Sequence, residues 1–261
     1  MGKIIALVNQ KGGVGKTTSS INLSASLGLL GKKTLLVDLD PQGNSTTGVG
    51  INKGEINSSV YELLMDRAEI KEVVVKTDFK NLYLIPASIN LAGVDMELKD
   101  LSRENPSFVP QFQLKKHLHK LIDIFDYIIL DCPPSLGMIT TNALAASNSV
   151  LIPAQCEFLS LQGIMQLLNS INLARKKLNP ELDIEGVLLT MLDARTNYGL
   201  EVVEEMKSFF KEKVYDTIIP RLVRLSEAPS HGKPIYSYDP KSRGTEAYIN
   251  LAKEVIKRNE N

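Results

Sequence analysis

Short, uninterrupted apolar runs alternate along the chain with longer stretches in which apolar residues recur at helical spacing. Continuous apolar runs are typical of strands that are covered on both faces. The runs that predict strands are residues 4–8, 34–38, 82–86, 127–131, 150–153, 186–190 and 217–219. Helical patterns include residues 17–30, 112–125, 159–178 and 201–210. This alternation predicts an α/β fold with a mostly parallel, doubly wound sheet flanked by helices.

Length and composition fit one domain over residues 1–261. Hydrophobic residues make up 43% and charged residues 23% of the 261 positions, as in ordinary globular proteins. We interpret residues 49–57 and 100–113 as surface loops, and no linker-like tract divides the chain. With the first strand expected near residue 4, we expect no N-terminal helix-turn-helix module. Two cysteines imply no disulfide framework, and residues 4–8 are too short a run for a signal peptide or membrane span, which favours the cytoplasm.

The overall charge balance favours no class of partner. Lys plus Arg is 30 and Asp plus Glu is 30, so any basic surface must be local. Such a cluster lies in residues 217–243, where five cations and two anions leave an excess of three positive charges. The cations are Arg221, Arg224, Lys233, Lys241 and Arg243, against Glu227 and Asp239. This segment is the candidate for sequence-independent contacts with phosphates, and a solvated charged face is the alternative.

A glycine-rich segment between the first strand and the first helix predicts a phosphate-binding P-loop. It consists of Lys11, Gly12, Gly13, Val14, Gly15, Lys16, Thr17 and Thr18. Glycines let successive backbone N–H groups face phosphate oxygens, Lys16 can reach the terminal phosphates, and the Thr17 hydroxyl can ligate Mg²⁺. Gln10 stands where the usual pattern has glycine, and Lys11 is an additional lysine, for which a solvated surface position is the alternative. The motif predicts a P-loop NTPase that binds ATP with Mg²⁺.

Three aspartates follow predicted strands at the edge where an open α/β sheet binds its ligand. Asp38 and Asp40 fall on the same side of their strand, and two close carboxylates need a cation or a water between them. Turn or N-cap aspartates before Pro41 are the alternative. Asp131 ends a run of four apolar residues, as in a Walker B strand, and would hold Mg²⁺ through water.

These segments together resemble the ParA/Soj family of chromosome-partitioning ATPases, a deviant Walker A group within the MinD/ParA superfamily. The resemblance is carried by residues 11–18, 38–44, 131–137, 191–197 and 219–235 and runs from residue 3 to about 252. It implies an ATP-sandwich homodimer in which Lys11 reaches the partner's ATP. It also implies that Asp40 positions the attacking water and Asp38 supports the Mg²⁺ shell. Lys11, Lys16 and Asp40 are therefore the expected catalytic residues, and Thr17, Asp38 and Asp131 the expected metal site.

The resemblance also implies partners and a base pocket. Pro220 and Leu222 sit where the family binds adenine. Such proteins bind double-stranded DNA without sequence preference, associate with the nucleoid, respond to a ParB-type protein, and in Soj-type members act on the replication initiator. The expected DNA-contacting residues are Arg195 and Arg224, followed by Lys241 and Arg243.

Two other functions remain open from the residues alone. A MinD-like membrane-cycling ATPase would use residues 245–258 as a membrane-surface helix, whereas Glu246 and Glu254 favour packing of that helix on the sheet. A metabolic synthetase on the same fold would need a small substrate instead of DNA. We expect no membrane partner.

Overall fold

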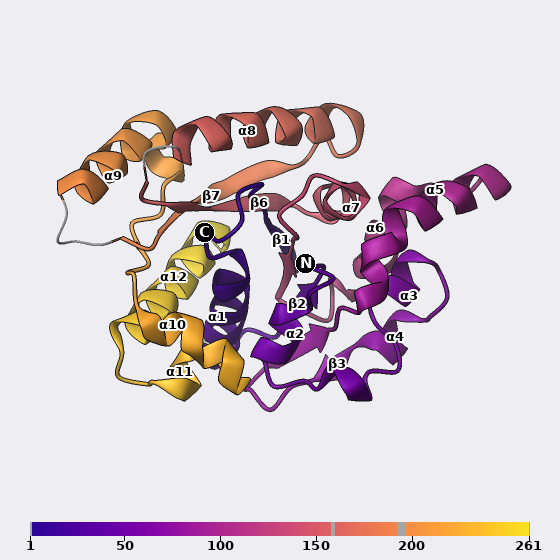
Figure 1. Ribbon diagram of the computed structural model, residues 1–261, viewed down its shortest axis with the longest axis horizontal. Helices are drawn as coiled ribbons and strands as arrows, with labels where there is room; N and C mark the ends of the chain where they lie inside the picture. The colour runs from indigo at the N-terminus through magenta and orange to yellow at the C-terminus, as the bar shows by residue number, and fades with distance from the viewer. Residues whose placement is uncertain (1, 158–159, 193–196, 261) are drawn as a thin grey trace.

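A seven-stranded sheet forms the centre of the molecule, and all its pairings are parallel except that of the edge strand β3 (Figure 1). The computed structural model describes residues 2–157, 160–192 and 197–260, with the backbone alone for residues 160–162 and 197–198. The strand order is β3-β4-β2-β5-β1-β6-β7. The strands are β1 Lys3–Leu7, β2 Thr34–Asp38, β3 Val75–Lys76, β4 Leu82–Ile85, β5 Tyr127–Asp131, β6 Ser149–Gln155 and β7 Asp183–Thr190. The predicted α/β, doubly wound P-loop fold is confirmed.

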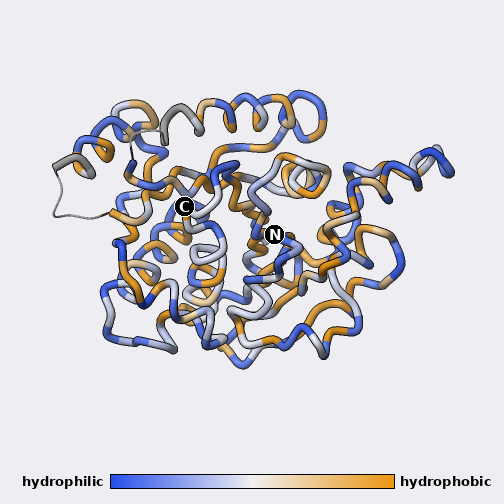
Figure 2. Tube along the Cα trace, in the orientation of Figure 1, coloured by the Kyte–Doolittle hydropathy of each residue, from blue (hydrophilic) through white to orange (hydrophobic). Residues whose placement is uncertain are grey.

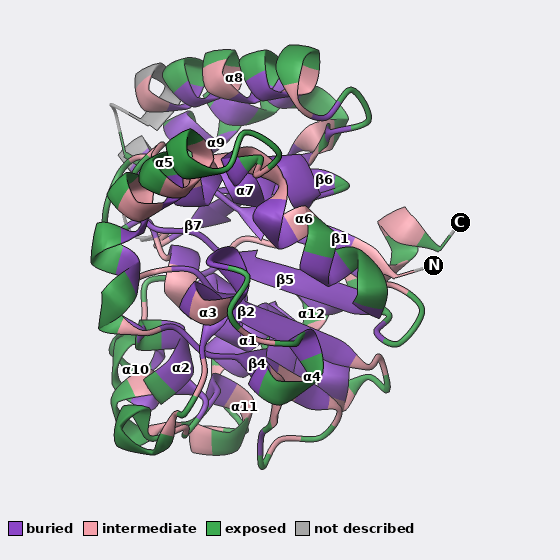
Figure 3. Cartoon of the chain, turned by 90° about the vertical axis from the view of Figure 1, so that its right-hand side faces the viewer, coloured by how far each residue is buried: buried purple, intermediate pink, exposed green. Residues whose placement is uncertain are grey.

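Helices cover both faces of the sheet, which is why its central strands are almost entirely apolar (Figure 3). Alternate residues of β1 enter different cores: Ile5 and Leu7 pack with one group of helices, and Ile4 and Ala6 with the other. The first group is α1 Lys16–Leu29, α10 Val223–Glu227, α11 Ile235–Tyr238 and α12 Arg243–Asn259. The second is α3 Val60–Leu64, α4 Ile70–Val73, α5 Val94–Glu104, α6 Gln113–Leu118, α7 Met138–Ala146, α8 Ser160–Lys177 and α9 Asn197–Phe210. Along α5 and α8 the trace changes repeatedly between polar and apolar, as expected of helices with one face in solvent (Figure 2).

The strand register brings the predicted acidic residues together. Asp131 of β5 pairs with Asp38 on one side and with Leu7 of β1 on the other. Parallel neighbours in register point to the same face of a sheet. The P-loop after β1 and the two carboxylates therefore meet at the carboxyl edge.

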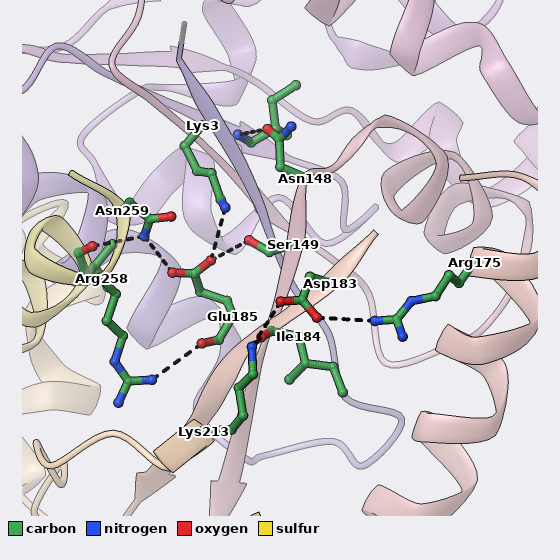
Figure 4. A network of polar contacts seen from close by, with 12 residues as sticks. Lys3, Asn148, Ser149, Arg175, Asp183, Ile184, Glu185, Lys213, Arg258 and Asn259 are labelled. Atoms are coloured by element: carbon green, nitrogen blue, oxygen red, sulfur yellow. Dashed lines mark hydrogen bonds and ion pairs between the residues drawn. The ribbon is translucent and has the colours of Figure 1, made fainter. Parts of the chain in front are cut away.

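The C-terminal helix α12 is part of the core. Tyr248, Leu251 and Val255 are buried against α1 and the sheet, so the prediction that this helix packs on the sheet is confirmed. At its end, Asn259 donates a 2.6 Å hydrogen bond to the buried Glu185 carboxylate of β7, which also accepts one from Ser149 (Figure 4). Among the described residues, no helix is long and apolar enough to cross a bilayer.

Three predictions about elements were wrong. Residues 217–219 form no strand: the Thr217 N–H donates to the Glu254 carboxylate, and the Ile219 N–H donates to the Leu189 carbonyl of β7. The isolated bridges lie on either side of this segment, at Val214 and Pro220. The single helix expected over residues 112–125 is α6 followed by a 3-10 turn, His119–Leu121. Residues 100–104, expected to be loop, continue α5.

Candidate nucleotide site

The loop between β1 and α1 has a backbone that requires glycine. Gly13 and Gly15 have φ angles of 73° and 82°, in the left-handed region where a side chain is strained. Gly15 is also the N-cap of α1, and no side chain caps this helix. Within the described residues, the backbone N–H groups of residues 12–18 have no acceptor in the protein. A helix N-terminus with a row of free N–H groups is a ready anion site.

Lys16 is the cation of this loop. It is buried, and its ammonium donates to the Lys11 carbonyl at 3.2 Å. Burial lowers the pKa of Lys16, and the negative charges of Asp131 and Asp40 oppose that shift. A buried ammonium with one carbonyl partner is suited to bind a further anion.

Neighbouring strands hold the loop from behind. The Asn9 side chain donates to the Pro153 carbonyl at 2.7 Å, and the Thr190 hydroxyl donates to the Val14 carbonyl at 2.9 Å. Gln155 donates to the Gly13 carbonyl at 2.8 Å. These bonds join residues more than 140 positions apart. Sequence reasoning missed Asn9, Gln155 and Thr190, whose one signal is their position at the ends of strands.

Asp131 is fully buried beside the loop. Its two oxygens accept hydrogen bonds from Ser20 of α1 at 3.0 Å and from Ser45 of the short helix α2 (Asn44–Gly48) at 2.7 Å. Burial raises the pKa of Asp131, and hydrogen bonds from Ser45 and from the Thr17 hydroxyl oppose the rise. The sequence prediction named Thr17 and Asp131 but missed both serines.

Asp38 is equally buried and is held by protein donors on both oxygens. Thr46 donates its backbone N–H and its hydroxyl to one oxygen, each at 2.7 Å, and the Asp40 N–H donates to the other at 3.2 Å. Burial, followed by the charge of Asp131, raises the pKa of Asp38 to about 7. Its predicted place in the Mg²⁺ shell stays a prediction.

The two predicted catalytic residues at the mouth of the site make local contacts. Asp40 is half-buried and accepts the Gln42 N–H at 2.9 Å, which stabilises the turn before α2. Lys11 is exposed, and its ammonium lies 3.0 Å from the Glu157 carboxylate of the same chain. Sequence reasoning missed Glu157, since nothing local marks a residue 146 positions away as a partner.

A cavity of about 220 Å³ adjoins the loop and has a largely apolar lining. Pro220 and Leu222 line it together with Gly15 and Thr18 of the phosphate loop and with Tyr248. The Tyr248 hydroxyl lies 3.1 Å from the Ser19 hydroxyl, which joins α12 to α1 at this point. The cavity is therefore contiguous with the phosphate loop, as an adenine pocket needs to be; that Pro220 and Leu222 contact adenine stays a prediction.

Three of the four residues predicted to contact DNA lie exposed among the described residues of the C-terminal third. Arg224 is exposed, with its Nε 3.6 Å from an Asp239 oxygen and its guanidinium 5.9 Å from the Tyr238 ring centroid. Lys241 and Arg243 are also exposed. Arg195 lies outside the described residues. The three described cations are accessible to a partner, and their DNA contacts stay predictions.

The residues of the site fit a nucleoside triphosphate with Mg²⁺. Free N–H groups and a buried ammonium suit phosphate oxygens, and a hydroxyl beside a buried carboxylate suits a hard divalent cation. This arrangement on a parallel sheet defines the class as P-loop NTPases.

Comparisons with known proteins narrow the class to a family. Residues 2–184 match a family model described as an AAA domain. The chain is 57% identical over 255 residues to the sporulation initiation inhibitor protein Soj of Bacillus subtilis, covering 98% of both chains. It is 50% identical over 258 residues to the chromosome-partitioning ATPase Soj of Treponema pallidum, covering 99% of this chain and 98% of that protein. This chain thus belongs to the ParA/Soj family of chromosome-partitioning proteins.

A solved structure shares the fold over the whole chain. It is the cobyrinic acid a,c-diamide synthase of Mycobacterium smegmatis with a bound ATP analogue and magnesium. The TM-score is 0.85 and the identity 35%, over 100% of this chain and 97% of that one. The resemblance stated from the motifs is confirmed at the level of the family and the fold.

Proposed function

We propose that this protein is an ATPase of chromosome or plasmid partitioning that works as an ATP-dependent dimer on DNA. The row of free N–H groups from Gly12 to Thr18, facing no protein acceptor among the described residues, carries the proposal. The process, chromosome partitioning, and the ATPase activity are both taken from the name of the Treponema pallidum relative. We propose that residues 1–261 act as a single ATPase domain.

The chain's own residues divide the work of hydrolysis. The loop N–H groups and Lys16 bind the phosphates, and Pro220 and Leu222 bind the adenine at the cavity beside the loop. Thr17 and Asp131, supported by Asp38, hold Mg²⁺, which supplies positive charge to the phosphate oxygens. Asp40 orients the attacking water. Lys11 contributes its ammonium to the partner's triphosphate, so a pair of subunits has a charge set that one subunit lacks.

The ATP-bound dimer binds double-stranded DNA without sequence preference and so associates with the nucleoid. Arg195, Arg224, Lys241 and Arg243 contact phosphates. A ParB-type protein stimulates hydrolysis and thereby releases the dimer, and the replication initiator is a further partner. This mode needs only phosphate contacts, so affinity should fall with salt at a logarithmic slope of about −0.9 per phosphate neutralised.

The deciding experiment measures ATP turnover with double-stranded DNA, with a ParB-type N-terminal peptide, with both and with neither. We expect weak basal turnover and the largest stimulation when DNA and the peptide are both present. Lys16→Ala should show no turnover under any of these conditions. Turnover that is independent of DNA but requires a carboxylic acid substrate would instead indicate a biosynthetic enzyme, such as the cobyrinic acid a,c-diamide synthase of Mycobacterium smegmatis. ATP-dependent sedimentation with anionic vesicles would indicate a MinD-like cycle, which the burial of the apolar face of α12 disfavours.

A further inference from the structure

The short helix α2 lies on two buried carboxylates that belong to different strands. Ser45 donates its hydroxyl to Asp131 at 2.7 Å, and Thr46 donates its N–H and hydroxyl to Asp38 at 2.7 Å. All four side chains have no measurable exposure to solvent. The first turn of α2 therefore closes over the carboxyl ends of β2 and β5.

The same helix is joined directly to the Asp40 turn. The Gly43 N–H donates to the Asp40 carbonyl at 2.8 Å, and Gly43 is the N-cap of α2 with a φ of 59°. Four residues separate Asp40 from Ser45 in sequence. A displacement of Ser45 is therefore transmitted to Asp40 through one hydrogen-bonded turn.

Asp131 is inaccessible as long as its neighbours stay in place. It has no exposed surface, so a metal-bound water can reach its oxygens only if a covering group withdraws. One covering donor, Ser20, belongs to α1, where the adjacent Ile21 and Leu23 are fully buried in the core. The Thr17 hydroxyl, also on α1, is a second donor, and the third is Ser45, on a five-residue helix whose N-terminus no side chain caps.

The donor to the second carboxylate, Asp38, cannot move away as easily. Thr46 makes three bonds, because its hydroxyl also accepts the Ala87 N–H at 3.1 Å after β4. The Ser45 hydroxyl donates its one hydrogen bond to Asp131. Among the described donors to these two carboxylates, Ser45 lies on a short helix and can move away by breaking one side-chain hydrogen bond.

We propose that Ser45 is a positioning residue: its hydroxyl, which covers Asp131, withdraws when a magnesium nucleotide binds, and this withdrawal shifts the Asp40 turn. The inference rests on the proposed nucleotide site. In this proposal, α2 couples magnesium binding at Asp131 to the position of Asp40, the residue proposed to orient the attacking water. It applies to this chain's Ser45 and adds nothing to the role of Lys11.

The test compares nucleotide affinity in excess magnesium with affinity in EDTA, using a fluorescent ATP analogue. The ratio of the two affinities is the magnesium effect. Ser45→Ala removes the competing donor, so the magnesium effect should rise, by about tenfold to a hundredfold for one hydrogen bond to a charged group. Thr47→Ala is the matched control, because Thr47 lies on the same helix and its hydroxyl, among the described residues, contacts only the Gly43 and Asn44 carbonyls, at 3.4 Å. Its magnesium effect should equal that of the wild type.

A purely structural role would weaken binding equally in both buffers and leave the ratio unchanged, and that result overturns the proposal. If Ser45→Ala is too unstable to assay, hydrogen–deuterium exchange on the wild-type protein decides. With saturating nucleotide, magnesium should accelerate exchange of the Val49 amide, whose acceptor is the Ser45 carbonyl, and should leave the Thr46 amide, which is bonded to Asp38, unchanged. Equal exchange with magnesium and with EDTA refutes the inference. Absence of any nucleotide binding by the wild type would instead remove the proposed function itself.

Discussion

The contact between Lys11 and Glu157 predicts a dimer that forms more readily once the glutamate is neutralised. Lys11 is proposed to reach the partner's triphosphate, whereas in the single chain its ammonium lies 3.0 Å from the Glu157 carboxylate. While Lys11 is paired with Glu157 of its own subunit, it cannot contact the partner's triphosphate. Glu157→Gln removes the charge that holds it and leaves the size of the side chain almost unchanged.

The structure limits the size of this effect. The two side chains are 44% and 55% exposed, and ion pairs of this kind contribute about 0.2–1 kcal/mol. At the upper limit, release of one lysine multiplies its free population by about five. A dimer needs two such lysines, so its association constant should rise by at most about 25-fold. Salt screens an exposed pair, so the advantage of the variant should shrink as ionic strength rises.

Sedimentation equilibrium in saturating ATP, in an Asp40→Ala background that prevents turnover, measures the association constant directly. The exposed Glu104 on α5 provides the control, Glu104→Gln, which should leave the constant unchanged. A weaker dimer in Glu157→Gln would refute the reasoning, because Glu157 would then contribute to the assembled dimer. An advantage that persists at high salt would also contradict an ionic origin.

Three further predictions follow from the site. Asp40→Ala should bind the fluorescent nucleotide normally yet lose turnover by about a hundredfold or more, measured as phosphate release; normal turnover would contradict its role with water. The raised pKa of Asp38, about 7 against an ordinary 3.8, means that its contribution to stability is complete below about pH 3.8 and is lost as pH rises through about 7. Urea unfolding of nucleotide-free protein should therefore show lower stability near pH 8 than near pH 6, and Asp38→Asn should flatten that difference; an unchanged slope in the variant would assign it to other groups. Gly15→Ala should lower the free energy of unfolding by about 1 kcal/mol, because its φ is 82°, whereas Gly12→Ala, at a position with no atom within 4 Å of an added Cβ, should not; equal losses would contradict the strain argument.

Local spacing was sufficient to predict the centre of the site. Gly13 and Gly15 mark left-handed positions directly, and apolar runs that end in Asp38 and Asp131 locate the carboxyl edge of the sheet. These features depend on neighbours in sequence or on the regular geometry of parallel strands. The family resemblance rests on the same residues.

The groups that hold the site could not be predicted, because their partners are distant in the chain. Ser45 reaches Asp131 across 86 positions, and Gln155 reaches Gly13 across 142. The wrong strand at residues 217–219 has a similar cause. Its apolar residues do face the core, but Glu254 of α12 takes the Asp216 and Thr217 N–H groups, which no local pattern reveals.

The last turn of α12 matters for how the protein can be engineered. Asn259 and Ser149 solvate the buried Glu185 carboxylate at the amino edge of the sheet, and the Arg258 guanidinium lies 4.0 Å from the Tyr215 ring centroid. Truncation before Arg258 would remove Asn259 as a hydrogen-bond donor to the buried Glu185 carboxylate. The free energy of unfolding should fall by about 1–3 kcal/mol as a result. Reporter fusions for tracking the protein in cells should therefore retain Arg258 and Asn259 and attach the reporter beyond them through a flexible spacer.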